Sequence, residues 1–101
     1  MSESVQNGEA VLNPDKDIIA SESRKLREQM QNLVEEGALR ITINMEKVEL
    51  VDSSGIGVLV GIQNALKNKG GELKIVNVSQ DIYKMFKIMR LDKHITISQS
   101  T

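Results

Sequence analysis

The sequence contains no cysteine, and Pro14 is its one proline among 101 residues. Without cysteine, the chain has neither disulfides nor thiolate chemistry, and nothing calls for an oxidising compartment. Tyr83 and Phe86 are too few aromatic residues to build a stacking platform for single-stranded nucleic acid. The 13 basic and 14 acidic residues give a net charge of −1, so no overall field attracts nucleic acid or an anionic membrane.

Long apolar runs are missing as well. No segment approaches the roughly 18 consecutive apolar residues of a membrane-spanning helix. The polar start MSESVQNGEA lacks the basic residues and apolar run of a signal peptide. We therefore expect a cytoplasmic protein without direct membrane insertion. With 40% hydrophobic and 27% charged residues, the chain suits one globular domain, predicted at 9–101 after a flexible tail at 1–8.

The spacing of apolar residues predicts strands and helices in alternation. The first helix is expected to start at an N-cap, Ser21 or Ser23, and to stop at Gly37. The second helix is expected over 54–69, and the third follows the N-cap Ser79. The predicted strands cover 9–12, 38–44, 48–51, 72–78 and 94–98. This order predicts a single small α/β domain, with a mixed β-sheet and helices packed on it.

The stretch VDSSGIGVLVG, residues 51–61, places an acid, two hydroxyls and three glycines where a strand is expected to meet a helix. It does not fit a dinucleotide fingerprint, because Val60 stands where the third glycine is required. A phosphate-binding P-loop is also excluded, since no Gly-Lys-Ser or Gly-Lys-Thr opens the helix. We predict no cofactor.

Catalysis and metal binding have no better support. A serine nucleophile needs a base, and the one histidine, His94, lies far along the chain beside the last predicted strand. The acidic pairs Asp15/Asp17 and Glu35/Glu36 are typical of a solvated face. We therefore predict no catalytic residue and no metal site, and interpret the chain as a non-enzyme.

The run Asp52-Ser-Ser-Gly-Ile-Gly-Val-Leu59 follows a β segment and precedes a helix, Gly70-Gly71 and a strand. In this it resembles the anti-sigma factor antagonists of the STAS domain family, and the likeness continues through residues 82–97. The resemblance implies a bacterial cytoplasmic switch. The unphosphorylated protein binds an anti-sigma factor that is also a serine kinase, and a sigma factor is released. Phosphorylation of Ser53 ends that binding, with Ser54 as the alternative acceptor, and a phosphoserine phosphatase reverses it.

Two alternatives remain open from the same resemblance. Small STAS-like proteins also serve as accessory subunits of ABC-type lipid transporters. In those subunits the corresponding motif more often resembles Asp-Thr-Ala-Gly than the Asp-Ser-Ser-Gly found here. Family members also usually begin with two paired strands, whereas only the short segments 9–12 and 17–20 stand in that place. The N-terminal hairpin is therefore left open.

The physics of a helix start agrees with a phosphate acceptor here. The free amides and the positive end of the helix dipole tolerate a phosphate on Ser53 or Ser54. A phosphoserine adds roughly −1.5 to −2 charges beside Asp52, which opposes a docked partner without unfolding the domain. Ser53 could also be simply an N-cap, which is expected at this place for stability alone, and the two roles can coexist.

A helical wheel of residues 54–69 predicts where the partner docks. With Leu59, Ile62 and Leu66 turned inward, Ile56 and Val60 fall on the outer side, beside a strip formed by Gly57 and Gly61. Each of these two glycines costs roughly 1 kcal/mol of helix stability relative to alanine, and their small size admits a partner backbone. The predicted partner-binding residues are Asp52, Ser53, Ser54, Gly55, Ile56, Gly57, Val60 and Gly61.

Overall fold

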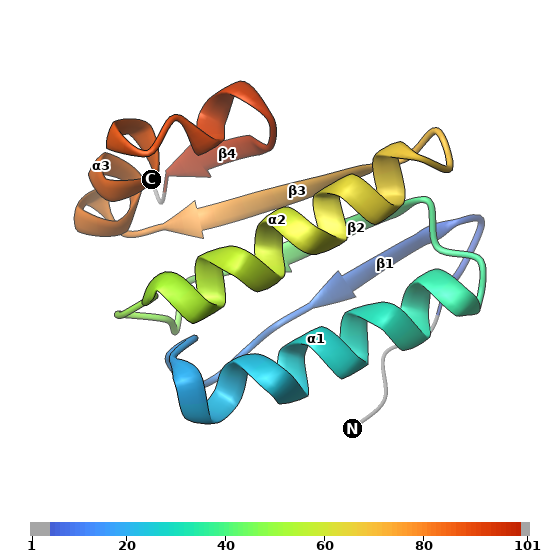
Figure 1. The fold of residues 1–101 in the computed structure, drawn as a ribbon, viewed down its shortest axis with the longest axis horizontal. Coiled ribbons are helices and arrows are strands. Elements are labelled where there is room, and N and C mark those ends of the chain that lie inside the picture. The colour runs from blue at the N-terminus through green and yellow to red at the C-terminus, as the bar shows by residue number, and fades with distance from the viewer. Residues whose placement is uncertain (1–4, 100–101) are drawn as a thin grey trace.

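The computed structural model describes residues 5–99 as a parallel sheet with helices packed on it (Figure 1). The strands are β1 (Glu9–Leu12), β2 (Arg40–Asn44), β3 (Glu72–Val78) and β4 (Thr96–Gln99). The helices are α1 (Ala20–Glu35), α2 (Ser53–Lys67) and α3 (Gln80–Ile88), and a short 3-10 helix, η1 (Leu91–Lys93), precedes β4. The predicted small α/β domain is confirmed.

The sheet follows the order of the chain, β1-β2-β3-β4, and each of these neighbours pairs in parallel. The expected mixed sheet is therefore corrected to a parallel one. Antiparallel pairing occurs in an isolated bridge between Gln6 and Glu9. Parallel strands need a crossover between them, and α1, α2 and α3 supply the three crossovers.

One face of the sheet carries the core. Leu12, Ile43, Ile75 and Ile97 are register partners in a row across all four strands, and the first three are buried. Figure 1 shows α1 and α2 side by side over the sheet, while α3 lies beside β4. The helices contribute these buried apolar side chains: Leu26, Met30, Leu33 and Val34 from α1, Ile56, Val58, Leu59, Ile62 and Leu66 from α2, and Ile82 and Phe86 from α3. The alternating burial of the strands follows from the two-residue period of β structure.

The described chain begins with a tight turn. Gln6 and Glu9 exchange two backbone hydrogen bonds of 2.9 and 3.0 Å around Asn7 and Gly8, which have φ values of 56° and 78°. Two positive φ values in a two-residue loop are typical of hairpin turns, and Asn-Gly is the preferred sequence for them. Val5 packs against the core. Residues 5–8 of the predicted tail therefore include a hydrogen-bonded turn, and residues 1–4 lie outside the described part of the chain.

The predicted strand at 48–51 is reduced to a single bridge between Val51 and Ile18. The reason lies in Asp17, whose Oδ1 accepts hydrogen bonds from the backbone amides of Glu49 (2.9 Å) and Leu50 (3.1 Å). A side chain therefore satisfies amides that a strand ladder would otherwise use. The loop between β2 and α2 is tied in this way to the loop between β1 and α1.

The helix ends are close to their predicted positions. Gly37 terminates the first helix region with a φ of 103°, a left-handed conformation that favours glycine. Ser79 caps α3 by accepting a hydrogen bond from the Ile82 amide, as predicted. The start of α1 differs from the prediction. Ser21 lies inside the helix, and the residue at the N-cap position of α1, Ile19, makes no side-chain hydrogen bond to the helix.

Candidate functional site at the junction of two helices

The starts of α1 and α2 meet at one place. Ile18 and Val51 form a parallel bridge, in which the Ile18 amide donates to the Leu50 carbonyl (2.9 Å) and the Asp52 amide donates to the Ile18 carbonyl (3.2 Å). Each helix begins directly after this bridge, at Ala20 and at Ser53. The amino-terminal ends of two helices therefore converge on the segment that contains the Asp-Ser-Ser-Gly motif.

Asp52 joins the two helix starts through its carboxylate. Oδ1 accepts from the Gly55 amide (3.0 Å), which is the expected N-cap bond of α2. Oδ2 accepts from the Ala20 amide (3.0 Å), in the first turn of α1, 32 residues away in sequence. One side chain thus satisfies free amides of two helices, which explains why α1 has no cap from its own segment.

The Asp52 carboxylate is held in its ionised form. A hydrogen bond from the Ser54 hydroxyl lowers its pKa below the usual value of 3.8, and the backbone amides of Gly55 and Ala20 act in the same direction. Partial desolvation raises the pKa but does not outweigh these bonds. A fixed negative charge therefore stands beside both serines at neutral pH.

The two serines of the motif differ in what their hydroxyls do. The Ser54 hydroxyl donates to Asp52 Oδ1 at 2.6 Å, a short bond of the kind expected for a charged acceptor. Ser53 is exposed, and among the described residues its hydroxyl has no hydrogen-bond partner. Asp52, rather than Ser53, is the N-cap residue, so the interpretation of Ser53 as only a cap is wrong.

Gly55 is required by packing. A Cβ at this position would collide with the Ile18 carbonyl oxygen and would lie 2.7 Å from Ile18 Cγ2. Gly55 is buried, so it is not available to a partner and instead lets α2 approach the Ile18–Val51 bridge closely. The prediction that Gly55 contacts the partner is therefore replaced by a structural role.

The outer face of α2 is narrower than the helical wheel predicted. Ile56 is only 8% exposed and belongs to the core, so its predicted place on the outer side is wrong. Val60 is half-buried and packs against the core. Ile56 lies on the same side of α2 as Gln63, whose side chain accepts a hydrogen bond from the Leu73 amide of β3, so the side of α2 turned toward β3 buries more residues than the wheel predicted. The exposed strip consists of Ser53, Ser54, Gly57, Gly61 and Asn64.

This strip borders a groove between α1 and α2 with a volume of about 510 Å³. Gly57 and Gly61 line it, and a Cβ on either would meet no atom within 4 Å. Val58 and Ile62 supply apolar surface, while Arg27 and Glu35 of α1 stand at its other side. The predicted small-residue strip is therefore open to solvent, and it begins at the two serines.

Two exposed apolar residues near the site were missed by the sequence reasoning. Leu50 is 61% exposed two residues before Asp52, and Ile19 is 36% exposed directly before Ala20. Both flank backbone groups that hydrogen-bond within the junction. A signal was present in the sequence, since Leu50 lies in the apolar run next to the motif, but the predicted strand placed it in a sheet.

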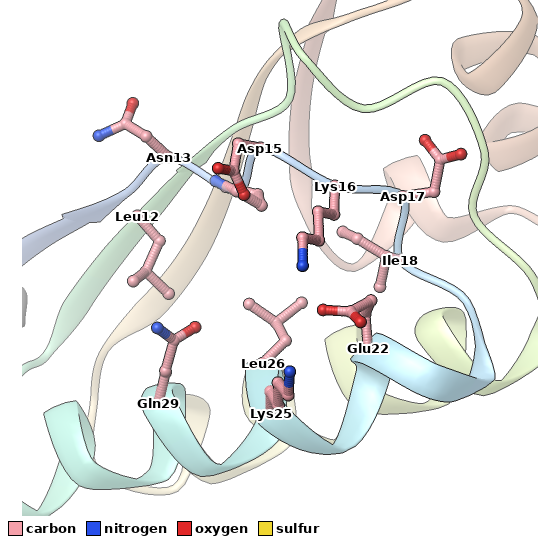
Figure 2. A pocket seen from close by; sticks show the side chains of 11 residues that line it. Leu12, Asn13, Asp15, Lys16, Asp17, Ile18, Glu22, Lys25, Leu26 and Gln29 are labelled. Atoms are coloured by element: carbon pink, nitrogen blue, oxygen red, sulfur yellow. The ribbon is translucent and has the colours of Figure 1, made fainter. Parts of the chain in front are cut away.

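A second hollow, of about 530 Å³, lies between the β1–α1 loop and α1 (Figure 2). Lys16 and Glu22 point into the space between loop and helix, whereas Asp17 points away, toward the amides it binds. Leu12 and Leu26 contribute apolar lining. The hollow mixes both signs of charge, and none of the predicted site residues lines it.

Within residues 5–99, no three acidic or histidine side chains are grouped so as to hold a metal ion. The helices described there are also too short or too polar to cross a membrane.

The described residues thus form a small parallel α/β domain with an exposed, unbonded serine at the start of a helix. The STAS domain model matches residues 2–101, and the chain belongs to this family. The resemblance inferred from the Asp-Ser-Ser-Gly motif is confirmed.

Individual relatives agree with this assignment. The anti-sigma-B factor antagonist of Bacillus subtilis is 40% identical over 73 residues, which are 72% of this chain and 66% of that protein, just under two thirds of its length. Among solved structures, the anti-sigma factor antagonist SpoIIAA in its unphosphorylated form has a TM-score of 0.78 at 20% identity, covering 100% of this chain and 88% of SpoIIAA. SpoIIAA of Bacillus in its phosphorylated form has a TM-score of 0.75 at 20% identity, with 96% and 88% covered.

Proposed function

We propose that this protein is an anti-sigma factor antagonist of the bacterial cytoplasm, switched off by phosphorylation of Ser53. In its unphosphorylated form it binds an anti-sigma factor with serine kinase activity, and a sigma factor is released. A phosphoserine phosphatase restores the binding form. The observation that carries the proposal is the exposed Ser53 hydroxyl, free of intramolecular hydrogen bonds beside a Ser54 hydroxyl that is occupied.

The relatives support the same function. The Bacillus subtilis relative is named for antagonising anti-sigma-B factor, which favours this role over that of a transporter subunit. SpoIIAA, which shares the fold, has been described in a phosphorylated and an unphosphorylated form. The fold therefore accommodates a phosphate.

The proposed docking surface combines the exposed strip of α2 with Leu50 and Ile19. The apolar pair supplies exposed side chains that lose contact with water on binding. Gly57 and Gly61 leave room for a partner backbone or side chain in the groove beside α1. Ser53 lies between these two parts, so a phosphate there enters the middle of the interface.

The charges at the junction of the two helices explain why phosphorylation would weaken partner binding. Asp52 already neutralises part of the positive ends of both helices, so a phosphate on Ser53 adds about −1.5 to −2 charges to a place that holds one. A partner surface that is complementary to the unmodified form then faces a phosphate that loses its water on binding and has no matching positive charge. Phosphorylation therefore lowers the affinity for the anti-sigma factor and leaves the fold of the domain unchanged.

The test uses the anti-sigma-B factor of Bacillus subtilis as the probe, because a relative named for it is available at 40% identity. With Mg-ATP, it is expected to add one phosphate, mapped by mass spectrometry to Ser53 and abolished in Ser53→Ala. Calorimetry is expected to show binding by wild type and Ser53→Ala, and weaker binding by Ser53→Asp. Phosphate on Ser54 of the wild type, or equal affinity of the alanine and aspartate variants, contradicts the proposal.

A further inference from the structure

The motif offers a kinase two adjacent hydroxyls at the start of one helix, both at exposed residues. Exposure alone therefore does not determine which of the two serines the kinase phosphorylates. The visible difference lies in bonding, since Ser54 Oγ is 2.6 Å from Asp52 Oδ1 while the described structure gives Ser53 no such bond. The same Asp52 oxygen also accepts from the Gly55 amide at 3.0 Å, which fixes its position relative to the helix.

We propose that Asp52 is a positioning residue that selects Ser53 as the acceptor by occupying the hydroxyl of Ser54. This inference rests on the proposed function and adds the reason for its site specificity. In the transfer, a bond forms between Ser53 Oγ and the γ-phosphorus of ATP, and the bond to the β,γ-bridging oxygen breaks. ADP leaves, and the hydroxyl proton passes to a base on the kinase.

The selection has two physical parts. To accept the phosphoryl group, Ser54 must first give up a hydrogen bond to an ionised acceptor, which is stronger than a neutral one. The transferred group would then stand within hydrogen-bond distance of the Asp52 carboxylate, whose charge opposes it. Asp52 stays in place because its second oxygen, Oδ2, is bound to the Ala20 amide of the other helix.

The opposite role for the same contact is that Asp52 activates Ser54 by drawing its proton. The two roles predict different products. If Asp52 acts as a base, phosphate is found on Ser54 of the wild-type protein and disappears when Asp52 is replaced. If Asp52 blocks Ser54, phosphate is found on Ser53 alone and Ser54 becomes reactive when Asp52 is replaced.

The first test compares four chains with the anti-sigma-B factor of Bacillus subtilis and Mg-ATP: wild type, Asp52→Ala, Ser53→Ala, and the double variant Asp52→Ala/Ser53→Ala. Mass spectrometry measures the fraction of phosphate on each serine. We expect the ratio of Ser54 to Ser53 phosphate to rise about tenfold or more in Asp52→Ala, as for loss of a hydrogen bond to a charged group. The double variant should accept phosphate on Ser54, whereas Ser53→Ala should accept none.

A merely structural role for Asp52 would lower labelling of both serines without changing their ratio, and that outcome overturns the proposal. If the wild type is labelled on neither serine, the proposed function fails instead. Whether Asp52 is hydrogen-bonded to the hydroxyl of Ser54 rather than Ser53 is then tested without a kinase. NMR follows the titration of the Asp52 side-chain carboxyl in the folded Ser53→Ala and Ser54→Ala variants.

In that titration, Ser54→Ala should raise the pKa of Asp52 toward its usual value of 3.8, because the bond that lowers the pKa most is lost. Ser53→Ala should leave the titration midpoint unchanged and serves as the matched control. Equal midpoints in the two variants would show that Asp52 does not distinguish the serines, and the selection would have to be abandoned whatever the kinase does. A raised midpoint in Ser54→Ala alone supports it.

Discussion

Gly55 and Gly57 stand two residues apart on α2 and have opposite surroundings. A side chain at Gly55 would collide with the backbone of Ile18, whereas one at Gly57 would meet nothing within 4 Å. The first glycine brings the start of α2 against the Ile18–Val51 bridge, and the second leaves a groove beside α1 open to solvent. The same residue type therefore fixes the fold at one place and keeps a surface free at the other.

The difference extends along the helix. The first turn of α2 is fixed by the Asp52 cap and by burial of Gly55 and Ile56. After this first turn, Gly57 and Gly61 lie in the exposed strip, where a larger side chain would meet no neighbouring atom. Packing does not require glycine at these two positions, although glycine lowers helix stability there. Glycines that cost helix stability and have open space fit the proposed docking of a partner at this strip.

The largest effect is expected for Gly55→Ala. The added methyl group must displace the Ile18 backbone, and overpacking of this kind costs about 1–3 kcal/mol or more. Urea denaturation of Gly55→Ala and wild type measures the loss of unfolding free energy, with Gly57→Ala as the matched control. A stable Gly55→Ala variant would remove the distinction between the two glycines.

The next effect is expected for Asp52→Asn, smaller than that of Gly55→Ala. The folded state depresses the pKa of Asp52, so its charge contributes stability above the usual value of 3.8, and this is lost as the pH falls through the lower folded value. The stability difference between wild type and Asp52→Asn should therefore be full at pH 7 and shrink below pH 3.8. Denaturation midpoints across this range measure it, and a pH-independent difference would contradict the charged cap.

Gly57→Ala and Gly61→Ala are expected to change stability in the opposite direction. Each should raise the free energy of unfolding by up to about 1 kcal/mol, because alanine is the better helix former and has open space. Both should weaken binding to the anti-sigma-B factor probe by calorimetry if the groove admits the partner. Unchanged affinity in both variants would place the partner elsewhere, while leaving the stability comparison intact.

The smallest effect on folding is expected for Ser53→Ala. Its hydroxyl makes no hydrogen bond within the described chain, so the unfolding free energy should stay within about 0.5 kcal/mol of wild type. Ser54→Ala is the paired variant and should lose more, since it removes the bond to Asp52. Thermal and urea unfolding of the pair provide the comparison. A greater loss in Ser53→Ala would mean that the hydroxyl roles are reversed.

Much of the fold could be predicted from local signals. The strand at Glu72–Val78 and the Ser79 cap of α3 were predicted at their observed positions, because the two-residue period and the capping residue are local features. The segment at 48–51 was predicted as a strand and is not one, because Asp17, more than 30 residues earlier, binds its amides. Ile56 was placed outside for a similar reason, since a wheel of one helix does not show how far the packing against neighbouring elements extends its buried side.

By itself, the sequence determined the α/β class, the family and the identity of the motif residues, because periodicity, caps and the Asp-Ser-Ser-Gly run are all written within short segments. Only the tertiary structure decided what each motif residue does. It brought the Ala20 amide to Asp52, placed the Ile18 backbone where a side chain at Gly55 would stand, and left the Ser53 hydroxyl free while Ser54 is bound. The first two roles depend on contacts between the segments that start α1 and α2, which are 32 or more residues apart along the chain. The third depends on how the side chains within the motif are oriented, which residue spacing alone does not specify.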